Sequence, residues 1–147
     1  MVQTTLETLA ALYEADETAW LEATADLVRD GRLDQVDRGT LAEYLTDMAR
    51  RDRREVTSRL GILLAHLLKW RHQPDQRSGS WRGTVEIQRQ ELAELLESGV
   101  LRNHADAVLD KAYANSVRQA AAETGLPEST FPDDCPYSLD EVLAALE

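Results

Sequence analysis

The stretch from Leu60 to Leu68 reads LGILLAHLL and is the most apolar segment of the chain. Its leucines recur at spacings of three and four residues, which places them on one face of an α-helix. Ile62, Ala65 and His66 widen that face, so most of the helix circumference is apolar. Such a helix lies in the middle of a bundle, covered on several sides. It is too short and too closely flanked by charges to be a membrane span, which needs about 20 apolar residues.

Turn-forming residues divide the rest of the chain into further helices. Gln73-Pro74 ends the leucine-rich helix near His72, because proline disfavours a helical residue before it and has no N–H to donate. Apolar spacing and breakers predict helices over about 17–30, 38–72, 81–97 and 103–124, and a short last helix to Leu146. Short connections favour antiparallel neighbours, so we expect an all-α antiparallel bundle of four main helices with a short C-terminal helix.

Several boundaries follow from capping residues. Asp16, Asp37 and Ser80 are expected to cap the helices that follow them, and Ser138 and Glu141 have capping-box spacing. Gly31 and Gly125 are expected to end helices, and Ser98-Gly99 is expected to end the helix over 81–97. Phe131, between polar neighbours in the proline-rich loop, is expected to plug the bundle.

Two points of this pattern stay open. Residues 50–55, RRDRRE, contain no apolar side chain, and Asp52 and Glu55 have the spacing of a fresh helix start. The apolar stripe resumes in the same phase at Val56, so we favour one long helix with a kink allowed near 50–54. Residues 1–14 suit either a short helix or a docked N-terminal arm. The length predicts a single domain, residues 1–147.

The formal net charge of −11 is distributed unevenly. Residues 50–89 carry ten Lys/Arg and four Asp/Glu, a net +6, which leaves −17 for the remainder. One interpretation is that acidic flanking helices fold onto this basic middle segment and neutralise it. The other is an arginine-lined patch that binds an anionic partner. The negative total opposes nucleic-acid binding, since the acidic remainder repels phosphate.

The loop over 69–82 is the best candidate site, for binding an anion or a partner. It contains Lys69, Trp70, Arg71, His72, Arg77, Ser80, Trp81 and Arg82. A serine at a helix N-terminus together with arginines suits a phosphate or a carboxylate, and tryptophan beside arginine suits stacking on a base. The alternative is structural: Trp70 and Trp81 are core plugs at one end of the bundle, and the arginines pair with neighbouring acids.

No spacing typical of catalysis or metal binding is present. His66 and His72 lack the Glu-x-x-His pattern of di-iron bundles, and one cysteine makes no thiolate cluster. His66 is expected to be a buried neutral imidazole that is hydrogen-bonded to a neighbour. Acidic neighbours of Cys135 are expected to raise the pKa of its thiol, and a lone cysteine fits a reducing cytoplasm. We therefore expect no metal, no cofactor and no catalytic residues.

Three long stretches carry a family resemblance. They are LYEADETAWLEATADLVRDGRLDQVD near the start, LLAHLLKWRHQPDQRSGSWRGTVEIQR in the middle and AAAETGLPESTFPDDCPYSLDEVL near the end. Together they resemble the bacterial "domain of unknown function 29" family over roughly residues 12–143. The resemblance implies an all-helical domain and implies no activity.

The favoured function is a small cytoplasmic protein-interaction or regulatory module without catalytic activity. Its partner would be another protein or a second copy in a homo-oligomer. The alternative is binding of nucleic acid, a nucleotide or another anion through the basic segment 50–89. We expect no membrane association, because no segment is long and apolar enough to span a bilayer.

Overall fold

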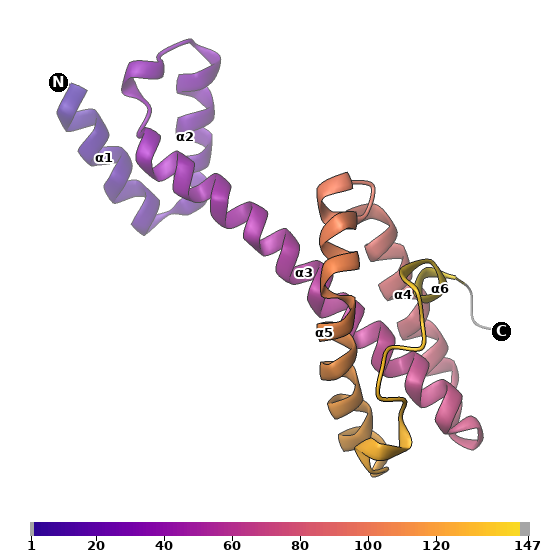
Figure 1. The fold of residues 1–147 in the computed structure, drawn as a ribbon. Coiled ribbons are helices and arrows are strands. Elements are labelled where there is room, and N and C mark those ends of the chain that lie inside the picture. The colour runs from indigo at the N-terminus through magenta and orange to yellow at the C-terminus, as the bar shows by residue number, and fades with distance from the viewer. Residues whose placement is uncertain (1, 145–147) are drawn as a thin grey trace. The chain divides into compact units, whose positions relative to one another are not determined.

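The computed structural model describes residues 2–144, and the side chains of residues 8–144. The helices are α1 (Val2–Ala15), α2 (Glu17–Arg29), α3 (Arg38–His72), α4 (Gly79–Leu95), α5 (Gly99–Thr124) and α6 (Leu139–Leu143) (Figure 1). Single 3-10 turns occur at η1 (Leu33–Gln35), η2 (Pro74–Gln76) and η3 (Glu128–Thr130). The described residues contain no strand, so the all-α prediction is confirmed. None of the described helices is long and apolar enough to cross a membrane.

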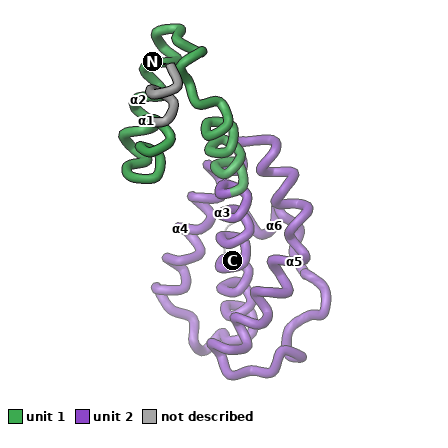
Figure 2. Tube along the Cα trace, turned by 90° about the vertical axis from the view of Figure 1, so that its left-hand side faces the viewer, with its two compact units in different colours: residues 1–50 green, residues 51–147 purple. Residues whose placement is uncertain are grey.

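The chain packs as two compact units, residues 1–50 and 51–147 (Figure 2). The boundary falls inside α3, which runs unbroken for 35 residues. The favoured long helix is therefore confirmed, and the RRDRRE stretch contains no helix break. The expectation of one domain over 1–147 stays a prediction, and it is tested below by the cooperativity of unfolding.

Unit 1 is built around Trp20, which is fully buried. Its ring meets the edge of Tyr13 from α1, with centroids 4.9 Å apart, and Tyr44 from α3 at 5.7 Å. The predicted caps are confirmed here: Asp16 Oδ1 accepts a hydrogen bond from the N–H of Ala19, and Asp37 caps the start of α3. Gly31 has a φ of +75° just past α2, a left-handed conformation that glycine adopts at little cost.

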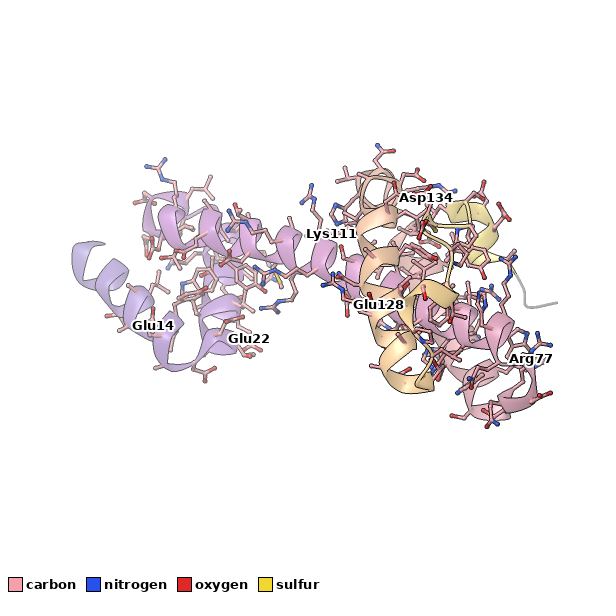
Figure 3. All side chains as sticks on the ribbon, turned by 60° about the horizontal axis from the view of Figure 1, so that its bottom comes forward. Glu14, Glu22, Arg77, Lys111, Glu128 and Asp134 are labelled. Atoms are coloured by element: carbon pink, nitrogen blue, oxygen red, sulfur yellow. The ribbon has the colours of Figure 1, made fainter. Side chains whose placement is uncertain are left out.

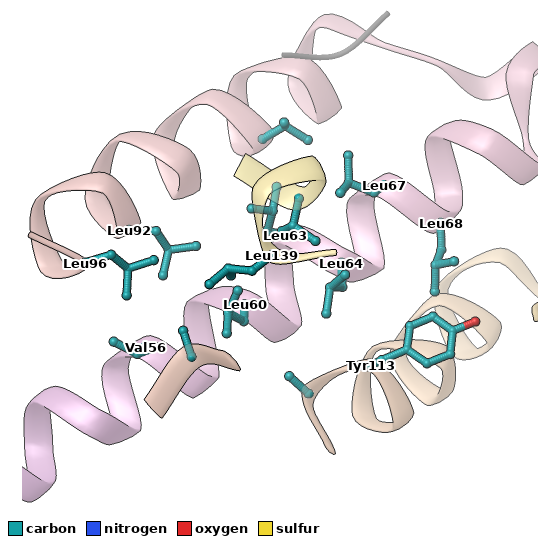
Figure 4. Packing of buried hydrophobic residues seen from close by; sticks show 14 of the residues in the cluster. Val56, Leu60, Leu63, Leu64, Leu67, Leu68, Leu92, Leu96, Tyr113 and Leu139 are labelled. Carbon is teal, nitrogen blue, oxygen red and sulfur yellow. The ribbon is translucent and has the colours of Figure 1, made fainter. Parts of the chain in front are cut away.

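The core of unit 2 is centred on the apolar half of α3. Leu60, Leu63, Leu64 and Leu68 are fully buried there. They belong to one core cluster with apolar residues of α4, α5 and the C-terminal segment, among them Val85, Ala105, Phe131 and Val142. Figure 4 shows Leu92, Tyr113 and Leu139 around them. The prediction of a central leucine-rich helix is confirmed, and so is the prediction that Phe131 plugs the bundle.

Two Ser-Gly pairs correct the predicted boundaries. Ser78, not Ser80, caps α4, because Ser78 Oγ accepts from the N–H of Trp81 and the helix already begins at Gly79. Ser98 was predicted only to end the preceding helix. Its hydroxyl accepts a hydrogen bond from the N–H of Leu101 and so caps α5, which begins at Gly99. In both pairs the glycine occupies the first helical position, outside the helix interior where it would be destabilising.

The C-terminal segment returns along unit 2 and ends in α6. The predicted capping box is present, with Ser138 and Glu141 bonded reciprocally. The helix is shorter than predicted, because Ala144 has an extended ψ of 164° and ends it after Leu143. The predicted end at Leu146 lies outside the described residues.

Candidate anion-binding site

The α3–α4 turn brings both tryptophans of the candidate loop to one place. α3 ends at His72, η2 follows, and α4 begins at Gly79, so a helix C-terminus and a helix N-terminus flank the same turn (Figure 1). Trp70 is about nine-tenths buried, whereas Trp81 is only partly buried. Arg77 lies at this turn (Figure 3).

Two arginines lie against the ring of Trp70. The Cζ atoms of Arg77 and Arg82 lie 4.8 and 5.2 Å from its ring centroid, within the range of cation–π attraction. Arg77 Nε also donates a hydrogen bond of 2.8 Å to the carbonyl oxygen of Trp70. That carbonyl belongs to the last turn of α3, where helical C=O groups lack intrahelical partners and a cation is favoured.

Lys69 is a structural cation rather than a free one. Its Nζ lies 2.7 Å from Glu123 Oε2 on α5, its side chain is only 8% exposed, and the ring centroid of Trp81 is 5.0 Å away. Burial alone would raise the pKa of Glu123, but hydrogen bonds from Lys69 and Gln119 bring that pKa below its usual value of 4.5. The pair joins the end of α3 to the end of α5.

We expect Glu123→Gln to lower the melting temperature in a pH-dependent way. Because the folded-state pKa of Glu123 is lowered, its carboxylate stabilises the fold above pH 4.5, and this contribution is lost as the pH falls through the folded-state value. The difference in melting temperature between parent and variant should therefore shrink on acidification. The exposed Glu94→Gln is the matched control. An unchanged difference for Glu123→Gln down to pH 3 would contradict this role.

Three other residues of the predicted site have different surroundings, namely Arg71, His72 and Ser80. The ring centroids of His72 and Phe131 lie 5.0 Å apart in an edge-on contact, and burial, with Arg71 nearby, lowers the pKa of His72 and so favours its neutral form. Arg71 is exposed. The carbonyl of Ser80 accepts a hydrogen bond from Thr84, and its side chain caps nothing.

A hollow of about 410 Å³ opens beside Trp70. It is lined by Trp70, Arg77, Ser78, Gly79 and Arg82. Of the eight predicted site residues, the structure thus brings three to this hollow and leaves Lys69, Arg71, His72, Ser80 and Trp81 outside it. Ser78 and Gly79 were missed, although Ser78-Gly79 ahead of an apolar run is itself a helix-start signal.

The arginines of this hollow have no acidic partner. Among the residues whose side chains are described, no ion pair involves Arg77 or Arg82, which are both exposed. Elsewhere in the basic segment some cations are paired with acids: Arg59 lies 2.9 Å from Glu55 and 3.8 Å from Glu91, and Lys69 pairs with Glu123. Internal neutralisation is therefore observed for part of the basic segment, and anion binding by Arg77 and Arg82 stays a prediction.

A second basic hollow, of about 330 Å³, lies between α3 and α5. It is lined by Arg53, Arg54, Thr57, Ser58, His104 and Lys111. A hydrogen bond of 3.2 Å joins Thr57 Oγ1 and His104 Nε2 across it. A signal for this hollow is present in the sequence, because Arg53 and Thr57 are four residues apart, and so are Arg54 and Ser58. The hollow has neither a tryptophan ring nor a helix N-terminus, so it offers an anion fewer fixed contacts.

The remaining titratable groups have structural surroundings. His66 Nδ1 donates to the carbonyl of Ile62 at 2.8 Å, and burial lowers the pKa of the imidazole. The predicted hydrogen bond is present, but the side chain is only partly buried. The pKa of the Cys135 thiol is raised, mainly by burial and then by Asp110 and Glu141 rather than by its sequence neighbours. Over the described range, no three His, Cys, Asp or Glu side chains are grouped as a metal site would need.

Comparison with known proteins gives one match. A family model described as "Domain of unknown function DUF29" matches residues 12–146. This match confirms the resemblance seen in the three sequence stretches. No curated protein and no solved structure matches the chain.

Proposed function

We propose a function for this chain on the premise that it belongs to the DUF29 family. It is a non-catalytic interaction module that holds a phosphate or carboxylate group of a protein partner in the hollow beside Trp70. The observation that carries this proposal is the pair of guanidiniums, Arg77 and Arg82, which lie against one indole ring without an acidic partner.

The arrangement suits an oxyanion. Stacking on Trp70 restricts both guanidiniums and leaves N–H groups of each free to donate, since Arg77 uses only Nε for the Trp70 carbonyl. The first-turn N–H groups of Gly79 and Ser80 have no intrahelical acceptor, and they add the positive end of the 17-residue helix α4. Charge-assisted bonds from arginine to a phosphate or carboxylate are about twice as strong as neutral ones.

Binding without chemistry fits the lining of this hollow. Ser78 is its one hydroxyl, and Ser78 Oγ accepts the capping hydrogen bond from Trp81 instead of facing a base. The lining contains no histidine, carboxylate, lysine or thiol that could act as an acid, base or nucleophile. The single cysteine of the chain, Cys135, fits a reducing cytoplasm as the working compartment.

We expect phosphate to stabilise the parent but not Arg82→Ala. At phosphate about tenfold above its Kd, linkage adds about 1.4 kcal/mol to stability, which is a rise of a few degrees in melting temperature. Without phosphate, Arg82→Ala should cost only about 0.5–1 kcal/mol, the size of an exposed cation–π contact. Arg71→Ala is the matched control, since it removes the same charge from the same turn but outside the hollow. Equal phosphate stabilisation of Arg82→Ala would contradict the proposal.

Nucleic-acid binding through 50–89 is the alternative, and we expect it to fail. The net charge of the chain is −11, so its acidic remainder repels a phosphate backbone, and Arg59 and Lys69 are already occupied by carboxylates. At ~150 mM salt, fluorescence anisotropy should detect no binding to a duplex DNA or RNA. Tight binding that weakens steeply with added salt would replace the proposal with the alternative.

A further inference from the structure

Unit 1 contains an apolar hollow that no sequence pattern singled out. It has a volume of about 420 Å³, within the range of about 300–1,000 Å³ that ligand pockets occupy. Its lining comes from α2 and the first turns of α3, namely Trp20, Leu21, Thr24, Ala25, Val28, Arg29, Leu41, Tyr44 and Leu45. Val28 and Leu45 are 47% and 58% exposed, so large apolar side chains face solvent at the hollow.

Two polar groups at the hollow have no partner. Within the described part of the chain, the indole Nε1 of Trp20 and the hydroxyl of Thr24 are buried and make no hydrogen bond. Both residues are more than nine-tenths buried. Burying such a group without a bond typically costs about 1–3 kcal/mol. Neither atom is exposed to the hollow in this structure, so an occupant would recover that free energy only after the Trp20 and Thr24 side chains turn toward it.

The net charge of unit 1 indicates which kind of partner can occupy this hollow. Residues 1–50 carry eleven acidic and four basic residues, a net charge of −7. The one cation of the lining, Arg29, is already paired with Asp26 at 2.7 Å. Carboxylates also border the aromatic cluster: the pKa of Tyr13 is raised by burial and then by Glu17, Glu43, Asp47 and Glu14.

We propose that this hollow is the docking site for a cationic amphipathic helix of a protein partner. The apolar face of that helix covers Val28 and Leu45, and the Trp20 and Thr24 side chains turn toward it to bond a polar side chain on it. Its lysines or arginines lie over the surrounding carboxylates, as charge complementarity requires. An anionic bilayer surface would be repelled by the acidic unit, and so would the same face of a second copy.

The test uses the full chain and two synthetic helical peptides. Both peptides carry leucine at the i, i+3, i+4 and i+7 positions and one glutamine within that stripe. One has lysine at all other positions and the other has glutamate. The readout is the indole Nε1–H resonances of the three tryptophans in ¹H–¹⁵N spectra at ~150 mM salt. We expect the lysine peptide to shift Trp20 while Trp70 and Trp81 stay unchanged, and the glutamate peptide to leave Trp20 unchanged.

Two variants that each add one negative charge distinguish docking in the hollow from nonspecific electrostatic attraction. Leu45→Glu removes apolar surface from the hollow, whereas Leu33→Glu changes a side chain that is 60% exposed and lies outside it. We expect Leu45→Glu to weaken lysine-peptide binding about tenfold or more, and Leu33→Glu to leave it unchanged. Equal effects of the two variants, or an unmoved Trp20 resonance, would overturn the proposal. A parent dimer in sedimentation that Leu45→Glu dissociates would overturn it in favour of a second copy.

This inference is independent of the anion site. It rests on residues of unit 1 and an apolar, acidic surface, whereas the anion site rests on arginines of unit 2. Phosphate binding at Trp70 and peptide binding at Trp20 are read from different resonances. Either proposal can therefore fail without the other.

Discussion

Replacing Leu64 with alanine should lower the free energy of unfolding by about 2–5 kcal/mol. Leu64 is fully buried on the most apolar part of α3, where the core of unit 2 meets it from α4, α5 and the C-terminal segment (Figure 4). The truncation removes apolar contacts and leaves a cavity that surrounding helices fill only partly. Denaturant unfolding followed by far-UV circular dichroism measures the loss.

The matched control for Leu64→Ala is Ile87→Ala on α4. Ile87 is 57% exposed, so its truncation should change stability by about 0.5 kcal/mol or less. A loss below about 1 kcal/mol for Leu64→Ala would show that α3 is not the centre of this core. If Ile87→Ala also lowered the free energy of unfolding by about 2 kcal/mol or more, the loss in Leu64→Ala would not be due to burial of its side chain.

Replacing Trp20 with alanine should remove about 3–5 kcal/mol from the core of unit 1. Trp20 is fully buried between Tyr13 and Tyr44 and is the largest side chain of that core. This variant also tests the single-domain prediction, because its remaining tryptophans, Trp70 and Trp81, both belong to unit 2.

Since one unbroken helix belongs to both units, we expect them to unfold together. In Trp20→Ala, tryptophan fluorescence and far-UV circular dichroism should then give one coincident transition, shifted from that of the parent. Trp20→Phe should shift it less, because more of the buried ring volume is kept. A fluorescence midpoint that stays at the parent value, with an earlier loss of helical signal, would mean that the two units unfold separately.

The features that could be predicted from sequence are those encoded locally. The three- and four-residue spacing around Leu64 identifies a buried helix face whatever packs against it. Asp16, Asp37 and the Ser138–Glu141 pair act on backbone N–H groups two or three residues away, so their capping role depends on nothing distant. The phase of the stripe on both sides of RRDRRE likewise identified one long helix.

Features that depend on a choice between two similar residues, or on a partner distant in sequence, were harder to predict. Ser78 and Ser80 are both good caps, and the choice between them decides which backbone N–H groups face the anion-binding hollow. Lys69 and Arg82 look alike in the sequence, but Glu123, 54 residues beyond Lys69, pairs with one and leaves the other without an acid. The apolar hollow of unit 1 exists only once α2 packs beside α3, so no periodicity marks it.

The most direct test of the anion site is a titration with inorganic phosphate at constant ionic strength, followed through the indole Nε1–H resonances. We predict a saturable shift of Trp70, no shift of Trp20, and loss of the Trp70 response in Arg82→Ala but not in Arg71→Ala. A Trp70 resonance that phosphate leaves unmoved, or one that moves equally in Arg82→Ala, would contradict an anion-binding role for this turn.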